Sequence, residues 1–344
     1  MTLRLVLWIA AAFAAVALPF VVLMTGERGE SKGTLWDFTM GLGFGALALA
    51  GLQFALTARF RRLAHPFGLD IVYLFHRYLA LGAVALMLCH FSILYVWFQD
   101  MLGELNPLTA RWDVTAGRIA LVCFLALIIL SEFRKRLRHG YEAWRYLHVG
   151  LAIFGFGAAI AHVLGVGRFT AEFGTRMLWL GVTLGWVGLL AWVRLAKPWD
   201  QARNPWRLVE TVRERGGVVS LVFEPLGKSL GRWMPGQFAW LTLQNSPFGL
   251  REHPFTISSA PEQGPRITMS IKPLGDFTER ATTTDPGAIA YIDGPYGAFS
   301  IDRHKDAEGF VMIAGGVGIT PMMANLRAML ARGDHRPGVL LYAN

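Results

Sequence analysis

Four histidines in apolar segments have the residue type and spacing of ligands to a metal macrocycle. His76 and His90 lie in one segment, His148 and His162 lie in another, and each pair is separated by fourteen positions. In a helix, fourteen residues rise about 21 Å and bring a side chain back to within about 40° of the same face. Two such helices side by side would present two stacked pairs of imidazoles. Because a flat macrocycle takes one axial ligand on each side, the spacing predicts two bis-histidine haems inside a membrane.

A simpler interpretation of one histidine in an apolar helix is a buried interior residue or a proton-relay group. Two pairs with identical spacing favour ligation, because four neutral imidazoles in hydrocarbon would each need partners for a donor and an acceptor. The two cysteines, Cys89 and Cys123, belong to no Cys-x-x-Cys-His motif. We therefore expect non-covalent haems of the b type.

The elements that must position these histidines are membrane helices. Hydrophobic residues make up 53% of the chain and charged residues 17%, and Pro, Gly, Arg and Glu become frequent after Lys197-Pro198. Before that point, six apolar stretches are long enough to cross a bilayer: residues 4–24, 36–58, 71–98, 115–132, 143–165 and 177–195. The third and fifth carry the histidines and cross in the same direction. His76 should therefore pair with His148, and His90 with His162.

The loops between these stretches predict the orientation. Basic residues gather in two of them, and acidic residues gather in the loop between the third and fourth stretches. The basic set is Arg59, Arg61, Arg62, Arg134, Lys135, Arg136 and Arg138, and the acidic set is Asp100, Glu104 and Asp113. We expect an integral protein of a bacterial inner membrane, with residues 4–24 as a retained anchor and with the N-terminus and the C-terminal part in the cytoplasm. This topology accounts for much of the net charge of +9, so nucleic-acid binding is not expected.

Two aromatic residues lie between the ligands of the fifth stretch. The rings of Phe154 and Phe156 could occupy the gap between the two macrocycles, and simple packing is the alternative interpretation. Several arginines could neutralise haem propionates, although anchoring at the membrane interface explains them equally well. These arginines are Arg77, Arg118, Arg138 and Arg145.

The C-terminal part begins with alternating apolar and polar runs, which predict short antiparallel strands of a β-barrel at residues 218–223, 237–243 and 266–271. The most specific segment follows the second strand and joins an aromatic ring to a row of hydroxyls. It consists of His253, Pro254, Phe255, Thr256, Ile257, Ser258 and Ser259. A flat isoalloxazine needs a ring to pack on and hydrogen bonds at its edge, so this segment predicts a flavin site.

A second segment combines a cation, a glycine and a hydroxyl at the expected start of a helix. Its members are Lys272, Gly275, Phe277 and Thr278. A helix N-terminus with small residues can bind a pyrophosphate, although a Gly-Asp pair is usually only a turn. Residues 293–297 are expected to form a structural tight turn that closes the domain.

The last segment reads as a strand, a glycine-rich turn and a helix. Residues 310–314 predict a buried strand, and residues 322–331 predict a helix. The turn between them contributes Gly315, Gly316, Gly318, Thr320 and Pro321. This order is typical of the start of a dinucleotide-binding α/β unit, although Thr-Pro stands where the last glycine of Gly-x-Gly-x-x-Gly would be.

Taken together, these motifs resemble the ferric reductase and NADPH oxidase superfamily. His-Arg-Tyr-Leu at 76–79 through His90, the basic loop before His148 and His162, residues 253–259 and residues 315–321 carry the resemblance, which covers nearly the whole chain. It implies a six-helix transmembrane bundle with two b haems over residues 1–199. An antiparallel β-barrel that binds FAD would follow over 200–302, and the start of an α/β domain that binds NADPH or NADH over 303–344.

The resemblance also implies roles. The four histidines become haem ligands, residues 253–259 and 275–278 the flavin and flavin-phosphate sites, and residues 315–321 the dinucleotide-phosphate turn. Electrons would pass from NAD(P)H to FAD, then across both haems to an extracytoplasmic acceptor, either dioxygen or a ferric or cupric chelate. The family places an arginine near the outer haem, a role that Arg176 could take unless it is an interface anchor. Leu94 replaces a family histidine and counts mildly against an efficient oxidase.

Two alternatives stay open at this point. The chain stops at residues 341–344, in the expected second strand of the dinucleotide domain, so we expect a truncated chain, with a naturally short chain as the alternative. The alternative function is a non-catalytic haem and flavin electron carrier that serves a separate reductase, for example a periplasmic acceptor protein. The flavin barrel within this chain disfavours the carrier.

Overall fold

The computed structural model describes residues 32–60, 68–106, 108–134, 136 and 140–343, together with Ala10 and Ala14. These residues fall into two compact units, one formed by residues 1–59 and 70–192, the other by residues 60–69 and 193–344. The first predicted span, residues 4–24, lies outside the described residues apart from those two alanines. Arg61, Arg62, Lys135 and Arg138 of the basic loops also lie outside them.

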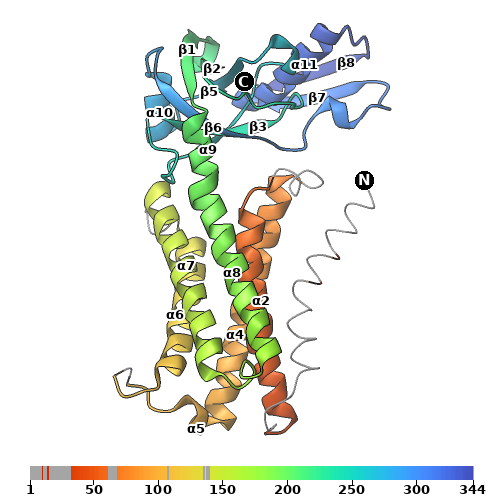
Figure 1. Cartoon of the computed structure of the whole chain (residues 1–344). Helices are drawn as coiled ribbons and strands as arrows, with labels where there is room; N and C mark the ends of the chain where they lie inside the picture. The colour runs from red at the N-terminus through yellow and green to blue at the C-terminus, as the bar shows by residue number, and fades with distance from the viewer. Residues whose placement is uncertain are drawn as a thin grey trace. The chain divides into compact units, whose positions relative to one another are not determined.

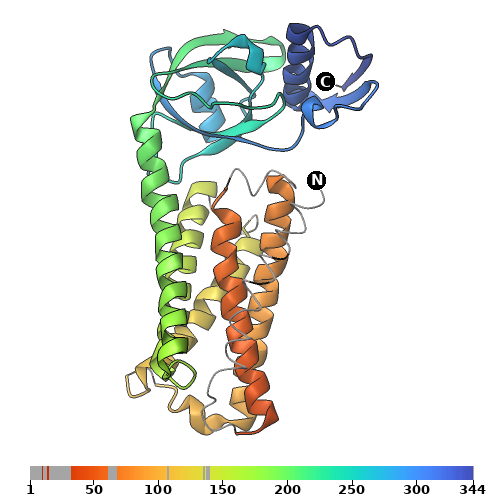
Figure 2. The same cartoon turned by 45° about the vertical axis from the view of Figure 1, so that its right-hand side comes forward.

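The first unit is a bundle of long apolar helices (Figures 1 and 2). The part of the chain that the structure describes has five helices long and apolar enough to cross a membrane. They are α2 (Thr34–Thr57), α4 (Leu69–Trp97), α6 (Trp112–Glu132), α7 (Tyr141–Val166) and a continuous helical run, Phe173–Arg203, that begins with α8 (Phe173–Ala191). The short helix α5 (Gln99–Leu102) follows α4. Five of the six predicted spans are thus confirmed as helices, with ends that differ by a few residues.

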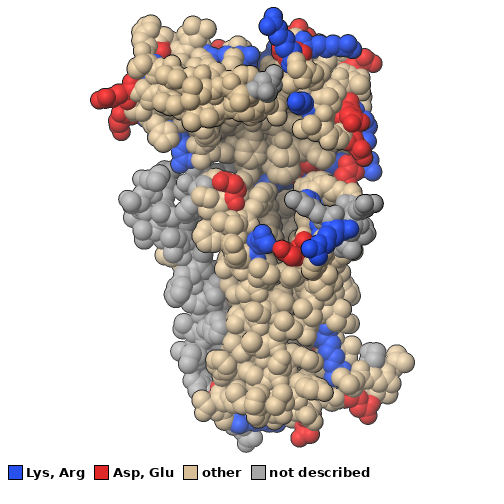
Figure 3. All heavy atoms as spheres, turned by 180° about the vertical axis from the view of Figure 1, so that it is seen from behind, with Lys and Arg blue, Asp and Glu red and all other residues tan. Residues whose placement is uncertain are grey.

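Aromatic side chains fill the interior of this bundle. Phe156 of α7 is 2% exposed and packs against Phe54 of α2 and Trp186 of α8, with ring centroids 5.3 and 4.8 Å apart. The helices α6 and α7 are in close contact at Gly155, where an added Cβ would lie 2.8 Å from the Cβ of Cys123. Small residues allow membrane helices to approach in this way. On the face seen in Figure 3, charged side chains gather toward the two ends of the bundle, as membrane helices require.

In the second unit, α9 (Lys197–Arg203) leads into a six-stranded antiparallel sheet. Its strands are β1 (Trp206–Arg213), β2 (Val219–Pro225), β3 (Phe238–Leu243), β4 (His253–Thr256), β5 (Ile267–Ile271) and β6 (Ile289–Tyr296), in the spatial order β4-β3-β6-β1-β2-β5. Alternate residues such as Leu221, Phe223, Leu241 and Met269 are fully buried and form the core of the sheet. The three strands predicted from alternation are confirmed.

Two expectations for this sheet were wrong. The sheet does not close into the predicted β-barrel, because the edge strands β4 and β5 do not pair along their length; the segment after β4 meets β5 at an isolated bridge between Ile257 and Met269. Residues 293–297 do not form a turn after the sheet. Asp293 and Tyr296 lie within β6 and pair with Trp240 and Phe238 of β3. Pairing in the middle of the sheet outweighs the turn preference of Gly and Pro at this position.

The chain ends in a parallel strand, helix and strand arrangement. The strand β7 (Phe310–Gly315) leads through a turn at Gly316–Ile319 into α11 (Thr320–Arg332), and β8 (Gly338–Ala343) returns parallel to β7. Met312 of β7 and Met329 of α11 are buried in one small core. A helical crossover between neighbouring parallel strands is the building unit of dinucleotide-binding domains. The predicted strand, turn and helix are confirmed.

Candidate functional site

The structure brings the four histidines together as two facing pairs. His76 of α4 and His148 of α7 have ring centroids 6.3 Å apart. Bonds between a metal and imidazole nitrogen are about 2.0–2.1 Å long, so a metal between two imidazoles separates the ring centroids by about 6 Å. The His76–His148 pair therefore has the spacing that a shared metal would need.

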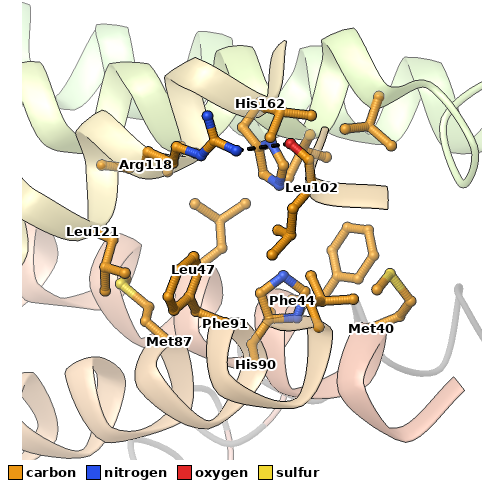
Figure 4. Close-up of a pocket in the computed structure, with 18 of the residues that line it drawn as sticks. Met40, Phe44, Leu47, Met87, His90, Phe91, Leu102, Arg118, Leu121 and His162 are labelled. Atoms are coloured by element: carbon orange, nitrogen blue, oxygen red, sulfur yellow. Dashed lines mark hydrogen bonds between the residues drawn. The ribbon is translucent and has the colours of Figure 1, made fainter. Parts of the chain in front are cut away.

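His90 of α4 and His162 of α7 face each other across a cavity of about 150 Å³ (Figure 4). Most of its walls are apolar. They include Met40, Phe44, Leu47, Met87 and Leu121. An apolar chamber with two imidazoles on opposite sides suits a flat, largely hydrophobic group held at its centre.

Hydrogen bonds set the tautomers of the second pair. The Nδ1 of His90 lies 2.7 Å from the carbonyl oxygen of Thr39, and the Nδ1 of His162 lies 2.8 Å from the carbonyl oxygen of Asp113. A carbonyl oxygen can only accept, so both Nδ1 atoms carry the proton and donate it. Each Nε2 therefore keeps its lone pair. A histidine that ligates a metal typically donates its other ring N–H to a carbonyl or carboxylate, so the donor set fits haem ligation.

The Nδ1 atoms of the His76–His148 pair have weaker hydrogen bonds than those of the second pair. The Nδ1 of His148 lies 3.2 Å from the hydroxyl of Ser131. The Nδ1 of His76 is buried and has no hydrogen-bond partner among the described residues. A buried polar atom without a partner is costly, and a metal bound between the rings would relieve that cost.

No group of three or more His, Cys, Asp or Glu side chains within the described ranges could hold a metal ion. Two protein ligands alone leave most coordination positions of a metal to another group. A porphyrin fills four positions in one plane and leaves two for axial imidazoles. Paired histidines in an apolar bundle therefore fit haem better than a free metal ion.

Of the other residues predicted for this site, some do not line the cavity, and others line it but also contact neighbouring protein groups. Phe154 is 62% exposed and does not line the cavity, and Arg176 is exposed and does not line it either. Two other arginines line the cavity. Arg118 donates to the carbonyl oxygens of Leu102 and Glu104, both at 2.7 Å. The guanidinium carbon of Arg168 lies over the ring of Trp36, 5.2 Å from its centroid. Sequence reasoning missed Arg168, although its position six residues after His162 was a usable signal.

The predicted flavin segment divides into an accessible part and a buried part. Ile257 is fully buried in the sheet core, and the hydroxyl of Ser258 donates to the carbonyl oxygen of Thr268 at 3.1 Å. The hydroxyl of Ser259 accepts from the backbone N–H of Thr268 at 3.1 Å. Only residues 253–256 keep exposed surface, so a ligand would meet His253, Pro254, Phe255 and Thr256.

An aromatic stack joins the two predicted flavin segments. Phe277 lies in the short helix α10 (Asp276–Thr282). Its ring centroid is 4.0 Å from that of His253, with the ring planes 26° apart, and 5.9 Å from that of Phe255, with the planes 19° apart. The hydroxyl of Thr278 accepts the N–H groups of Leu274 and Gly275 at 2.8 and 3.0 Å, so it builds the turn before α10. Lys272 is partly exposed beside this turn.

The glycine-rich turn after β7 has the geometry that its sequence predicts. Gly315 ends β7, Gly316 has a φ of 50°, Gly318 is exposed, and Pro321 lies in the first turn of α11. The hydroxyl of Thr320 donates to the carbonyl oxygen of Val317 at 2.5 Å. A left-handed φ favours glycine, and the helix dipole at the start of α11 favours an anion.

Arg332, in the last turn of α11, connects this helix to the rest of its unit. It pairs with Asp302 and, at 2.6 Å, with Glu262. The hydrogen bond to Asp302 above all raises the pKa of Arg332, so the guanidinium stays charged.

Because the groups are partly exposed, we expect Arg332→Ala to loosen α11 by about 1–2 kcal/mol. Faster amide exchange across α11 would report this loss, with exposed Lys305→Ala as the control. Equal exchange in both variants would contradict the prediction.

Three protein families match consecutive parts of the chain. Residues 42–159 match the family described as "Ferric reductase like transmembrane component", residues 216–300 an "FAD-binding domain", and residues 312–344 an "Oxidoreductase NAD-binding domain". Together with the five apolar helices, the first match indicates an integral membrane protein.

Curated relatives match parts of the chain. The ferredoxin reductase component of 3-ketosteroid-9-alpha-monooxygenase from Mycolicibacterium smegmatis is 32% identical over 146 residues, which is 40% of each chain. NADPH oxidase 1 of Rattus norvegicus is 32% identical over 99 residues, 27% of this chain and 17% of that one. Dual oxidase 1 of Canis lupus familiaris is 33% identical over 131 residues, 34% and 8% of the two chains. The chain thus spans 40% or less of the length of these relatives.

Solved structures with similar parts include phthalate dioxygenase reductase, at 21% identity and a TM-score of 0.36 over 42% of this chain and 44% of that one. The flavohemoglobin of Malassezia yamatoensis is 19% identical with a TM-score of 0.40, over 88% of this chain and 74% of that one.

Proposed function

Because this chain belongs to the ferric reductase and NADPH oxidase superfamily, we propose that it is a transmembrane oxidoreductase that moves electrons from cytosolic NAD(P)H to an acceptor across the membrane. The path would run through FAD and two b haems. The observation that carries the proposal is the pair of facing imidazole couples on α4 and α7, whose second couple donates both Nδ1 protons to backbone carbonyls. We place the domains at residues 1–199, 200–302 and 303–344.

Each site has a stated task in this proposal. His76 and His148 would hold the haem nearer the cytoplasm, and His90 and His162 the outer one. When bound, FAD supplies the change from two-electron to one-electron transfer and the haems carry single electrons. Arg118 and Arg168 bring positive charge to the wall of the cavity between His90 and His162, where it would neutralise carboxylates of the bound group. Arg77 is already paired with Glu132 at 2.9 Å, so it is less suited to that task.

In the cytoplasmic domain, the stack of His253, Phe277 and Phe255 would give the flavin a flat apolar surface, with Thr256 at its edge. Lys272 and the turn at Gly275 would lie near the flavin phosphates. The turn at Gly315, Gly316 and Gly318 and the start of α11 at Thr320 and Pro321 would bind the dinucleotide phosphates.

The ligand set bears on how an acceptor could receive an electron. Because His90 and His162 would both hold the outer haem, an acceptor would take an electron there without bonding to the metal. Such outer-sphere transfer suits dioxygen, which would become superoxide, and ferric or cupric chelates. We keep Arg176 as a proposed acceptor-side residue and Phe154 as a proposed residue near the electron path, although neither lines the cavity. We propose a bacterial inner membrane, with the flavin domain in the cytoplasm.

Membrane vesicles with the flavin domain outward test the proposal. NADPH is added outside, and ferricyanide or a superoxide-reactive dye is trapped inside. We expect NADPH-dependent reduction of the acceptor trapped inside the vesicle. A signal from the superoxide-reactive dye would indicate dioxygen as the acceptor, and reduction of ferricyanide without that signal would indicate a metal complex. If FAD is bound but NADPH leaves the haems oxidised while dithionite reduces them, the enzyme proposal is wrong and a carrier that needs a separate reductase is favoured.

A further inference from the structure

Two helices that carry no haem-ligand candidate hold His90 and His162 with the same pair of groups. In α2, the carbonyl of Thr39 accepts from His90 and Gly43 lies against its ring. In α6, the carbonyl of Asp113 accepts from His162 and Gly117 lies against that ring. Each glycine follows the carbonyl residue by four positions. We call each carbonyl and its glycine an imidazole seat.

The four-residue spacing explains why the two groups act on one ring. Residues four apart lie on the same face of a helix, about 6 Å apart along its axis. Each seat therefore forms one recess in the helix surface. The carbonyl oxygen borders the recess on one side, and the backbone at the glycine, which has no side chain, borders it on the other. An imidazole in this recess has its Nδ1 fixed by the carbonyl and one edge against the glycine, so its Nε2 is directed away from the seat helix.

The contacts leave little room for a methyl group. A Cβ added at Gly43 would lie 3.2 Å from both Nδ1 and Cε1 of His90. A Cβ added at Gly117 would lie 2.9 Å from Nδ1 and 3.0 Å from Cγ of His162. Both distances are below ordinary van der Waals contact, and the ring is tied by its hydrogen bond. The imidazole must move, and the Nε2 of the histidine moves with it.

The buried surroundings strengthen both seats. Thr39 is fully buried, and its hydroxyl donates to the carbonyl oxygen of His90 at 3.2 Å. The carboxylate of Asp113 is buried and pairs with Arg111 at 2.6 Å, which fixes the first turn of α6. The His76–His148 pair shows a different arrangement, because the partner of His148 is a serine hydroxyl and His76 Nδ1 has no partner within the described residues.

We propose that Thr39 with Gly43, and Asp113 with Gly117, are positioning residues that preorganise His90 and His162 for the outer haem. The inference rests on the proposed function, because it takes haem to be the ligand of this cavity. Partners that orient a metal-ligating histidine typically contribute 10–100-fold in metal affinity. The effect should be confined to one of the two haems, because the seats touch only one pair of histidines.

The test uses Gly43→Ala and Gly117→Ala, singly and together. Gly82→Ala in α4 and Gly150→Ala in α7 are matched controls, since a Cβ at either glycine meets nothing within 4 Å. Haem per chain is measured by pyridine haemochrome, and the two ferric haems are distinguished by low-temperature EPR. We expect each seat variant to weaken retention of one haem about 10–100-fold and to shift one EPR signal. Gly117→Ala should have the larger effect, because its contact is shorter.

The outcomes separate this inference from the proposed function. If the unmodified protein holds two haems and the seat variants keep both with the spectra of the controls, the seats are wrong and the proposed function stands. Loss of both haems together in the milder Gly43→Ala also contradicts the inference, because selectivity is its claim. If the unmodified protein binds no haem, the proposed function itself fails. The haem on His76 and His148 serves as the internal control for folding.

Discussion

Replacing His90 by leucine is expected to lower the haem content from two per chain to one and to leave flavin binding unchanged. Leucine fits an apolar helix, but it offers no lone pair, and His162 would face the cavity without a partner. A group that needs two axial imidazoles is then lost from this site, while the His76–His148 pair is unchanged. The measurement is a reduced-minus-oxidised spectrum with haem and flavin quantified per chain. Electron transfer to a trapped acceptor should disappear with the same variant.

Two further variants make this result specific. His335→Leu changes an exposed histidine outside the bundle and should retain both haems. His90→Gly leaves a space for free imidazole, so added imidazole should restore part of the missing signal. Retention of two haems in His90→Leu would contradict the assignment of His90 as a ligand.

The second large effect is expected at a buried ion pair in the flavin-binding unit. The Nζ of Lys197 in α9 lies 2.8 Å from Oδ2 of Asp293 and 2.9 Å from the hydroxyl of Tyr296, which donates to Oδ1 of Asp293 at 2.8 Å. The Asp293 side chain is only 3% exposed. Lys197→Met would leave this carboxylate buried without its cation. We expect a loss of about 3–5 kcal/mol in the stability of this unit, measured by thermal unfolding and by amide exchange of β6.

Matched variants identify the cause of that loss. Tyr296→Phe removes one hydrogen bond and should cost about 1 kcal/mol. The double variant Lys197→Met with Asp293→Leu should recover part of the stability, because it leaves no unpaired buried charge. If Lys197→Met costs no more than Tyr296→Phe, the ion pair does not have this structural role.

Local patterns in the sequence were sufficient for several features. The length of the apolar runs predicted five of the helices described, because a segment that crosses a membrane must be continuously apolar and must satisfy its own backbone. The fourteen-residue spacing predicted which histidines face each other, since helical periodicity and the alternation of spans are local properties. Alternating strands and the strand, turn and helix around Gly315 were predicted for the same reason.

Other features were decided only when distant segments packed together. Asp293 to Gly297 look like a turn, but Asp293 and Tyr296 pair with a neighbouring strand and Asp293 meets Lys197. Ser258 and Ser259 look available to a ligand, yet their hydroxyls bond to Thr268. Neither outcome follows from the local sequence, because each depends on which strand lies alongside.

The imidazole seats are the clearest case. Thr39 and His90 are 51 positions apart, and Asp113 and His162 are 49 positions apart. Nothing near Gly43 or Gly117 in the sequence distinguishes them from glycines that touch nothing, such as Gly82. Which glycine lies under an imidazole depends on how each helix is rotated about its axis and packed against its neighbours. The sequence alone determined that four histidines could form two pairs, and the tertiary structure decided which backbone groups hold one of them in place.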